Sequence, residues 1–264
     1  MRRRISLKGG ILAAVAALSL LAVVSIASGE IAAKDNLQIS FHGSIAPVKL
    51  PRKELAPVGV QLGAKIKTTD NTKPPRLAEI ILDINSHGLI DAKGLPLCSL
   101  GKLTNASAAR AKKVCGDAEV GHGNVTSRVG LPDQEEFSTN GPLLAFNGKY
   151  KGKQAIFAHV TSKGTLSITY VIIFVVHRTK GTYGTSLVAK VPAIASGSGY
   201  ISAFDLSLKR RYTLRGEKRS FVAASCPLPE GVNSASFPFA RSTYVFEGGT
   251  EVSAVLKREC KARG

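Results

Sequence analysis

The sequence predicts an all-β fold: an antiparallel β-sandwich or flattened barrel with one short helix flanked by a disulfide. Three observations predict it. Apolar and polar residues alternate over many short segments, and these segments follow one another roughly ten residues apart. Glycine-rich turns separate the segments. A single stretch of the chain has the composition of a helix.

The first strands can be located from this alternation. Residues 37–41 alternate apolar and polar side chains before Pro47 and Pro51 end the pattern, which indicates a strand followed by an extended connection. Residues 58–66 alternate in the same way, as expected for a strand with one buried face. Residues 78–84 form the next predicted strand.

The predicted helix lies between Cys98 and Cys115. Thr104 or Asn105 can cap its first turn, and Gly116 can end it. Alanines favour the helix intrinsically, and basic residues near its C-terminus complement the helix dipole. The alanines are Ala106, Ala108, Ala109 and Ala111, and the basic residues are Arg110, Lys112 and Lys113.

Hairpins with short glycine-containing turns account for the second half of the chain. The predicted pairs are 143–146 with 155–160 across Asn147-Gly148 and Lys151-Gly152-Lys153, 168–177 with 185–191 across Lys180-Gly181, 202–208 followed by 212–214 and 220–224 around Arg215-Gly216, and 244–246 with 252–256 across Glu247-Gly248-Gly249. The apolar run 170–176 predicts a central strand covered on both faces. Gly121 and Gly123 indicate a bulge or close strand packing rather than a phosphate-binding loop.

The N-terminus has the pattern of a secretory signal peptide. Four basic residues precede an uncharged apolar run over residues 11–26, and small residues stand at Ser25 and Ala27. We expect a signal peptide over residues 1–27, an N-terminal strand and extended connection over 28–56, and a single β-sandwich domain over 57–264. The alternative is an uncleaved segment that tethers the protein to the membrane. After cleavage we expect no transmembrane segment.

The charge of the chain favours anionic partners. The formal net charge is +18, and removal of the four positive charges of the signal leaves +14 (18 minus 4). Such an excess attracts anionic cell-wall polymer, acidic lipid or extracellular nucleic acid through non-specific charge, and it also keeps a protein soluble. The sequence does not indicate an oligomeric state.

The four cysteines predict two disulfides, because an exported chain reaches an oxidising compartment. Three pairings are open. We favour Cys98 with Cys115 and Cys226 with Cys260, since each pair is close in sequence and brackets one structural unit. A zinc site is the alternative, but the chain has no CxxC spacing and no histidine at zinc-finger distance.

No motif for catalysis is present. The chain lacks a nucleophile elbow, HExxH, P-loop and calcium loop. His159 and His177 lie on neighbouring predicted strands, and His122 could join them in a metal site, although strand histidines are more often simply packed or exposed. We therefore expect no catalytic residue, no metal and no cofactor.

The densest basic stretch lies on one predicted hairpin. Six basic residues surround Tyr212 and could bind phosphates, or could simply protect an exposed sheet edge. They are Lys209, Arg210, Arg211, Arg215, Lys218 and Arg219.

Several short segments carry a resemblance to a known family. They are Leu50-Pro51-Arg52, Pro57-Val58, Pro74-Pro75, Gly94-Leu95-Pro96-Leu97-Cys98, Leu144-Ala145-Phe146-Asn147-Gly148 and Ser225-Cys226-Pro227. Together they span nearly all of the chain after the signal. They resemble an uncharacterised family of exported β-rich proteins from high-GC Gram-positive soil bacteria. The resemblance implies export and one domain, and it assigns no activity to any residue.

These observations favour an exported, non-catalytic, basic β-sandwich protein of the cell envelope or extracellular space that can bind anionic polymers. The alternative is a secreted hydrolase whose site is assembled from loops and leaves no motif in the sequence.

Overall fold

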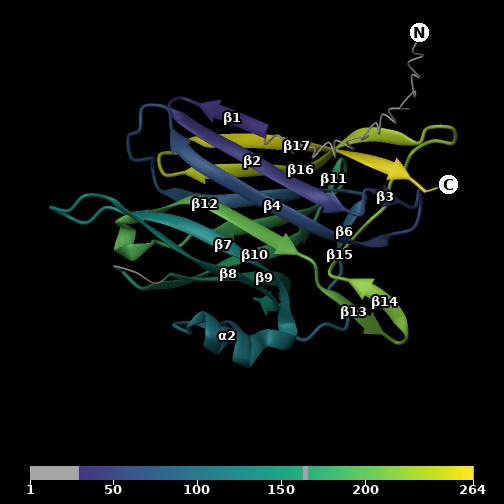
Figure 1. Ribbon diagram of the computed structural model, residues 1–264, viewed down its shortest axis with the longest axis horizontal. Coiled ribbons are helices and arrows are strands. Elements are labelled where there is room, and N and C mark those ends of the chain that lie inside the picture. The colour runs from purple at the N-terminus through teal and green to yellow at the C-terminus, as the bar shows by residue number, and fades with distance from the viewer. Residues whose placement is uncertain (1–29, 163–165, 264) are drawn as a thin grey trace, which may run out of the picture.

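A single curled sheet forms most of the protein (Figure 1). The computed structural model describes residues 30–162 and 166–263. Its main sheet runs, in order of neighbouring strands, β1 (Glu30–Lys34), β2 (Leu37–Ala46), β4 (Ala56–Thr68), β12 (Gly199–Leu208), β7 (Glu119–Val129), β8 (Phe137–Tyr150), β9 (Lys153–Ser162), β10 (Ile168–Arg178), β11 (Tyr183–Lys190), β5 (Leu77–Asn85), β16 (Ser234–Phe246), β17 (Glu251–Ala262) and β3 (Lys49–Leu50). The short strand β15 (Val222–Ala224) pairs with β4 and with β6 (Gly88–Ile90).

The predicted all-β fold is confirmed. Neighbouring strands along the sheet are antiparallel apart from β3, which runs parallel to β17. The sheet curls into a half-barrel, so that β1 and β2 contact β17 from the far end of the strand order. The Arg258 Nε atom donates a hydrogen bond to the Gly43 carbonyl oxygen at 2.6 Å and thereby joins β17 to β2.

The alternating pattern fixes which side chains enter the core. On β2, Leu37, Ile39 and Phe41 are buried while the residues between them are partly exposed. β2 pairs with β4 along its full length, from Leu37 opposite Thr68 to Ala46 opposite Gly59. The predicted first strand therefore belongs to the same sheet and the same core as the rest of the chain.

Two short helices cover the outer face of β8 and β9. They are α1 (Leu100–Leu103) and α2 (Ala108–Cys115), followed by the 3-10 turn η1 (Gly116–Ala118); a second such turn, η2 (Ala195–Gly197), precedes β12. Leu103 and Ala111 pack with Phe146 and Phe157 in a second, smaller core. The disulfide between Cys98 and Cys115 spans the helical segment, as the sequence indicated.

The predicted helix cap was wrong. Ser107 caps α2, and its hydroxyl accepts a hydrogen bond from the backbone N–H of Arg110 at 3.2 Å. Thr104 instead ends α1. Asn105 adopts a positive φ of 57°, which belongs to the turn between the helices and not to a cap.

One predicted turn is shorter than expected: its second part, Lys151-Gly152-Lys153, is confirmed, and its first part is not. Asn147-Gly148 continues β8, and the reversal into β9 occurs at Lys151-Gly152. A Cβ atom at Gly148 would overlap the ring of Phe157, so this glycine allows close packing and does not make a turn. The Asn147 Nδ2 atom donates to the Pro96 carbonyl oxygen at 2.9 Å, which holds the segment before Cys98 against the sheet.

The central strand β10 is less covered than its apolar run predicts. Ile172 and Val176 are buried on the inner face. Val171, Ile173 and Val175 point to the outer face and are only partly buried, because the helices cover β8 and β9 but end short of β10.

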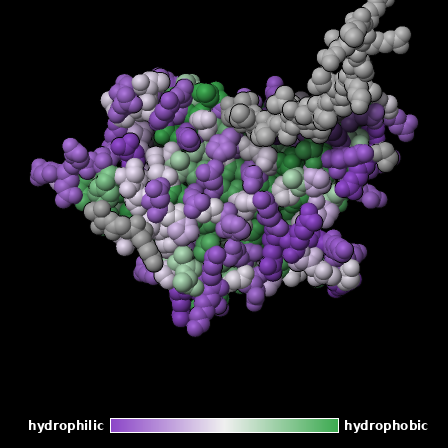
Figure 2. Space-filling model, viewed as in Figure 1, coloured by the Kyte–Doolittle hydropathy of each residue, from purple (hydrophilic) through white to green (hydrophobic). Residues whose placement is uncertain are grey.

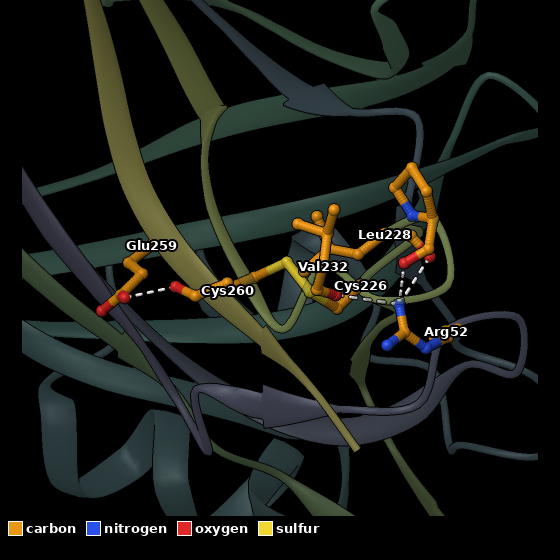
Figure 3. The surroundings of a disulfide bond; sticks show 8 residues. Arg52, Cys226, Leu228, Val232, Glu259 and Cys260 are labelled. Carbon is orange, nitrogen blue, oxygen red and sulfur yellow. Dashed lines mark hydrogen bonds between the residues drawn. A yellow bond between two sulfur atoms is a disulfide. The ribbon is translucent and has the colours of Figure 1, made fainter. Parts of the chain in front are cut away.

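The second disulfide joins Cys226, before β16, to Cys260 on β17 (Figure 3). Beside it, the Arg52 guanidinium donates to the carbonyl oxygens of Leu228, Pro229 and Val232 at 2.7 to 3.1 Å. The segment between β15 and β16 is thus held both covalently and by hydrogen bonds.

The predicted signal peptide lies outside the described residues. Within the ranges 30–162 and 166–263, no helix has the length and apolar character needed to cross a membrane.

Candidate functional site

The basic stretch forms a separate hairpin of β13 (Arg211–Leu214) and β14 (Glu217–Ser220). Its register pairs Tyr212 with Arg219 and Thr213 with Lys218, so these two pairs point to opposite faces. The Tyr212 hydroxyl donates to the Asp91 carbonyl oxygen at 3.3 Å, and Arg219 bonds the Asp91 carboxylate at 3.1 Å. The Tyr212 face is therefore docked on the protein, and the Thr213 face points outward.

The six predicted cations divide into two groups. Arg219 is engaged by Asp91 and by Glu217 at 2.7 Å, and its hydrogen bonds to these carboxylates raise its pKa. Arg210 is partly buried and reaches the Asp117 carbonyl oxygen at 3.4 Å. The other four, Lys209, Arg211, Arg215 and Lys218, are exposed and form no ion pair with any described residue.

Hydrophilic side chains gather at this hairpin in the space-filling view (Figure 2), at the lower right where Figure 1 places β13 and β14. Arg219 serves as an anchor, whereas the four exposed cations remain available to a partner. The sequence identified the charge but could not separate these two roles, because the separation depends on where Asp91 lies.

A polar contact crosses the neighbouring outer face of the sheet. The His42 Nε2 atom on β2 lies 2.9 Å from Asp205 Oδ1 on β12, although β4 runs between the two strands. The contact passes over Gly63, where an added Cβ would lie 2.5 Å from Asp205 Oδ1 and would also overlap the imidazole. Gly63 is therefore required for this pair to form.

A shallow polar groove extends from this contact toward the hairpin. Two adjoining hollows share His122 and Ser207, and together they form what we call the outer groove. It is defined by His42, Gln61, His122, Asp205, Ser207, Lys209 and Arg210. Asp205 stands at one end and the two cations at the other. This arrangement offers imidazole, amide, hydroxyl and cationic groups to a polar ligand.

Sequence reasoning missed His42 and Asp205. The residues lie far apart in the chain, and their meeting depends on the order β2, β4, β12, which the alternating pattern does not encode. The one available signal was Gly63 in the middle of an otherwise regular strand, since an internal strand glycine often marks a close approach.

The three histidines considered for a metal site lie apart. His159 pairs with Val171 of β10, whereas His177 lies six residues further along that strand, opposite Ser186 of β11. His122 lies in the outer groove, with its Nδ1 atom 3.5 Å from Glu119. No cluster of three metal-ligating side chains occurs in the part of the chain that the structure describes.

His159 should make the fold sensitive to acid. It is fully buried beneath the helical segment, with Nε2 2.9 Å from the Ala106 carbonyl oxygen, and burial lowers its pKa from the usual 6.5. The unfolded chain then binds a proton more readily than the folded one, so stability should fall as pH drops below about 6.5. Denaturant unfolding across pH 5 to 8 should show that the free energy of unfolding decreases less with falling pH in His159→Gln than in the unaltered protein. An equal dependence of the free energy of unfolding on pH in the two proteins would contradict this account.

Comparison with known proteins gave no match to any protein-family model, curated protein or solved structure.

Proposed function

We propose that the protein is an exported, non-catalytic binding protein for an anionic polymer in the cell envelope or extracellular space. The observation that carries the proposal is the outward group of four exposed cations, Lys209, Arg211, Arg215 and Lys218, beside the cationic end of the outer groove. The signal-like N-terminus and the two disulfides support an oxidising, extracytoplasmic compartment.

The hairpin is held against the protein on one face, and this favours binding of an anionic polymer by the cations on its other face. Tyr212 and Arg219 hold one face against the loop that contains Asp91, so the outward cations are presented on a fixed support rather than a free loop. A fixed support loses less conformational entropy when a polymer binds. Cations spaced along a hairpin can contact successive phosphates or other anionic groups of a chain and release their counterions.

The binding should depend on these four cations and on salt. Replacing Lys209, Arg211, Arg215 and Lys218 with Gln should weaken binding to teichoic acid, heparin or DNA at least about tenfold at low salt. It should also reduce the slope of log affinity against log salt by about 3.6 for duplex DNA, since each of the four lost phosphate contacts removes roughly 0.9 from that slope. Fluorescence anisotropy at several salt concentrations measures both quantities.

A matched variant separates a site from general surface charge. Lys34, Lys65, Lys67 and Lys73 are exposed, and their replacement with Gln removes the same charge away from the hairpin. We expect this control to change the affinity much less. If it weakens binding as strongly as the hairpin variant, the hairpin is not a site.

The second candidate is a secreted hydrolase, and the His42–Asp205 contact is the observation that favours it. A carboxylate beside an imidazole can orient it as a general base, and Ser207 in the same groove has a shielded hydroxyl with no hydrogen-bond partner in the described residues. Turnover of esterase, glycosidase, peptidase or phosphatase substrates that disappears in His42→Ala would favour this function over the first.

A further inference from the structure

A pocket lies on the outer face of β10 and β11, and we call it the β10 pocket. Its volume is about 500 Å³, within the range of small-molecule sites. Most of its lining is apolar, from Val171, Ile173, Val175, Val188, Val191 and Pro192. It shares no residue with the outer groove or with the basic hairpin, so it is independent of the proposed polymer site.

The floor of the β10 pocket is apolar because β10 is apolar on both faces. Ile172 enters the core, whereas its neighbours Val171 and Ile173 point to the outer face together with Val175. Val175 lies opposite Val188 of β11, which points to the same face. These outward side chains are only partly buried, so a ligand that covers them removes further apolar surface from water.

Cations outnumber carboxylates in the lining of the β10 pocket. Lys151 comes from the turn between β8 and β9, and Lys190 is the last residue of β11. Both are exposed and form no ion pair with any residue that the structure describes. Lys149 and Lys153, in and beside the same turn, are also exposed. Among the described residues, Glu79 of β5, which pairs with Lys190 in register, is the one carboxylate in the lining.

The β10 pocket therefore combines an apolar floor with exposed, unpaired lysines. We propose that it binds an amphipathic anion, an unbranched alkyl chain that ends in a carboxylate. The alkyl chain lies along Ile173, Val175 and Val188, and the carboxylate accepts hydrogen bonds from the ammonium groups of Lys151 and Lys190. Burial of hydrocarbon supplies most of the affinity, and the lysines favour an anionic ligand over a neutral one.

Titration with octanoate and with octanol, followed by NMR at roughly 0.15 M salt, tests the proposal. Both ligands should move the methyl resonances of Val171, Ile173, Val175 and Val188. Octanol has the same chain without the charge, so its dissociation constant should be about fivefold higher, as expected for two exposed charge contacts. Replacing Lys151 and Lys190 with Gln should weaken octanoate binding about fivefold and octanol binding less than about twofold.

Two further variants separate the role of the charge from that of the floor. Glu79→Gln removes the carboxylate that repels the ligand, so octanoate should bind about twofold more tightly while octanol binding stays the same. Val188→Gln replaces part of the apolar floor and should weaken octanoate and octanol alike, by about threefold or more. Thermal unfolding confirms that each variant folds.

Matched controls place the same changes outside the β10 pocket. Val255 points to the outer face of β17, and Lys65 and Lys67 are exposed on β4. Val255→Gln, and the replacement of both lysines with Gln, should leave octanoate binding within about twofold of the unaltered protein. The proposal is overturned if octanoate does not bind, if it moves resonances elsewhere, or if the Lys65 and Lys67 variant weakens binding as much as the Lys151 and Lys190 variant. None of these outcomes depends on the polymer-binding hairpin.

Discussion

Replacing Cys226 and Cys260 with alanine should lower the free energy of unfolding by about 4 kcal/mol. The disulfide joins residues 34 positions apart, and in the chain-entropy model a cross-link of that span restricts the unfolded chain by roughly this amount. Cys226 is fully buried, so the variant also loses packing at that end of the half-barrel. Urea unfolding of the doubly substituted and unaltered proteins measures the difference.

The other disulfide is the internal comparison. Cys98 and Cys115 are 17 positions apart, which corresponds to roughly 3 kcal/mol. Its loss should increase hydrogen exchange mainly in α1 and α2, whereas loss of Cys226–Cys260 should do so in β16, β17 and the segment before them. Two results would contradict these expectations. One is a larger loss in the free energy of unfolding when Cys98 and Cys115 are replaced than when Cys226 and Cys260 are. The other is hydrogen exchange that rises uniformly along the chain in both variants.

The alternation of apolar and polar residues predicted the strands well where one face of the strand is buried and the other is exposed to solvent. The alternation over residues 58–66 lies within β4, and the hairpin around Lys180-Gly181 is formed by β10 and β11. The errors arose where tertiary contacts override local preference. Asn147-Gly148 has the composition of a turn but continues β8, because Phe157 and Pro96 occupy the space around it.

The candidate site was only partly predictable for the same reason. The basic residues of the hairpin are visible in the sequence, but the inward position of Arg219 depends on Asp91, which lies 128 positions earlier in the chain. The outer groove depends on the sheet order that brings His42 to Asp205.

The backbones of β7 and β12 approach each other closely beside the outer groove. Gly121 and Gly123 lie on β7 directly against β12, and the pairing of β7 with β8 shifts register between Glu119 and Gly121. The sequence predicted a bulge or close strand packing here, and the structure shows both. The carbonyl groups that face the two glycines belong to Asp205 and Ser207, which define the outer groove.

Gly123→Ala should therefore destabilise the protein by at least about 3 kcal/mol, at the upper end of the usual cost of overpacking. An added Cβ at this position would overlap the carbonyl oxygen of Asp205, and that atom belongs to the backbone of β12 and cannot rotate away. β12 must shift from β7 along the pair that joins Gly123 to Leu206, which weakens ladder hydrogen bonds. Chemical denaturation should show the loss, and amide resonances of β12 should move.

Gly130→Ala distinguishes this steric cost from a general effect of losing a glycine. Gly130 follows β7, its φ is not in the left-handed region, and an added Cβ would meet the Glu136 side chain at 3.9 Å, an ordinary contact distance. Alanine reduces the entropy of the unfolded chain, so this variant should be neutral or more stable by up to about 1 kcal/mol. If Gly123→Ala is as stable as Gly130→Ala, then β7 and β12 do not approach as closely as the structure indicates, and the outer groove between them has a different shape.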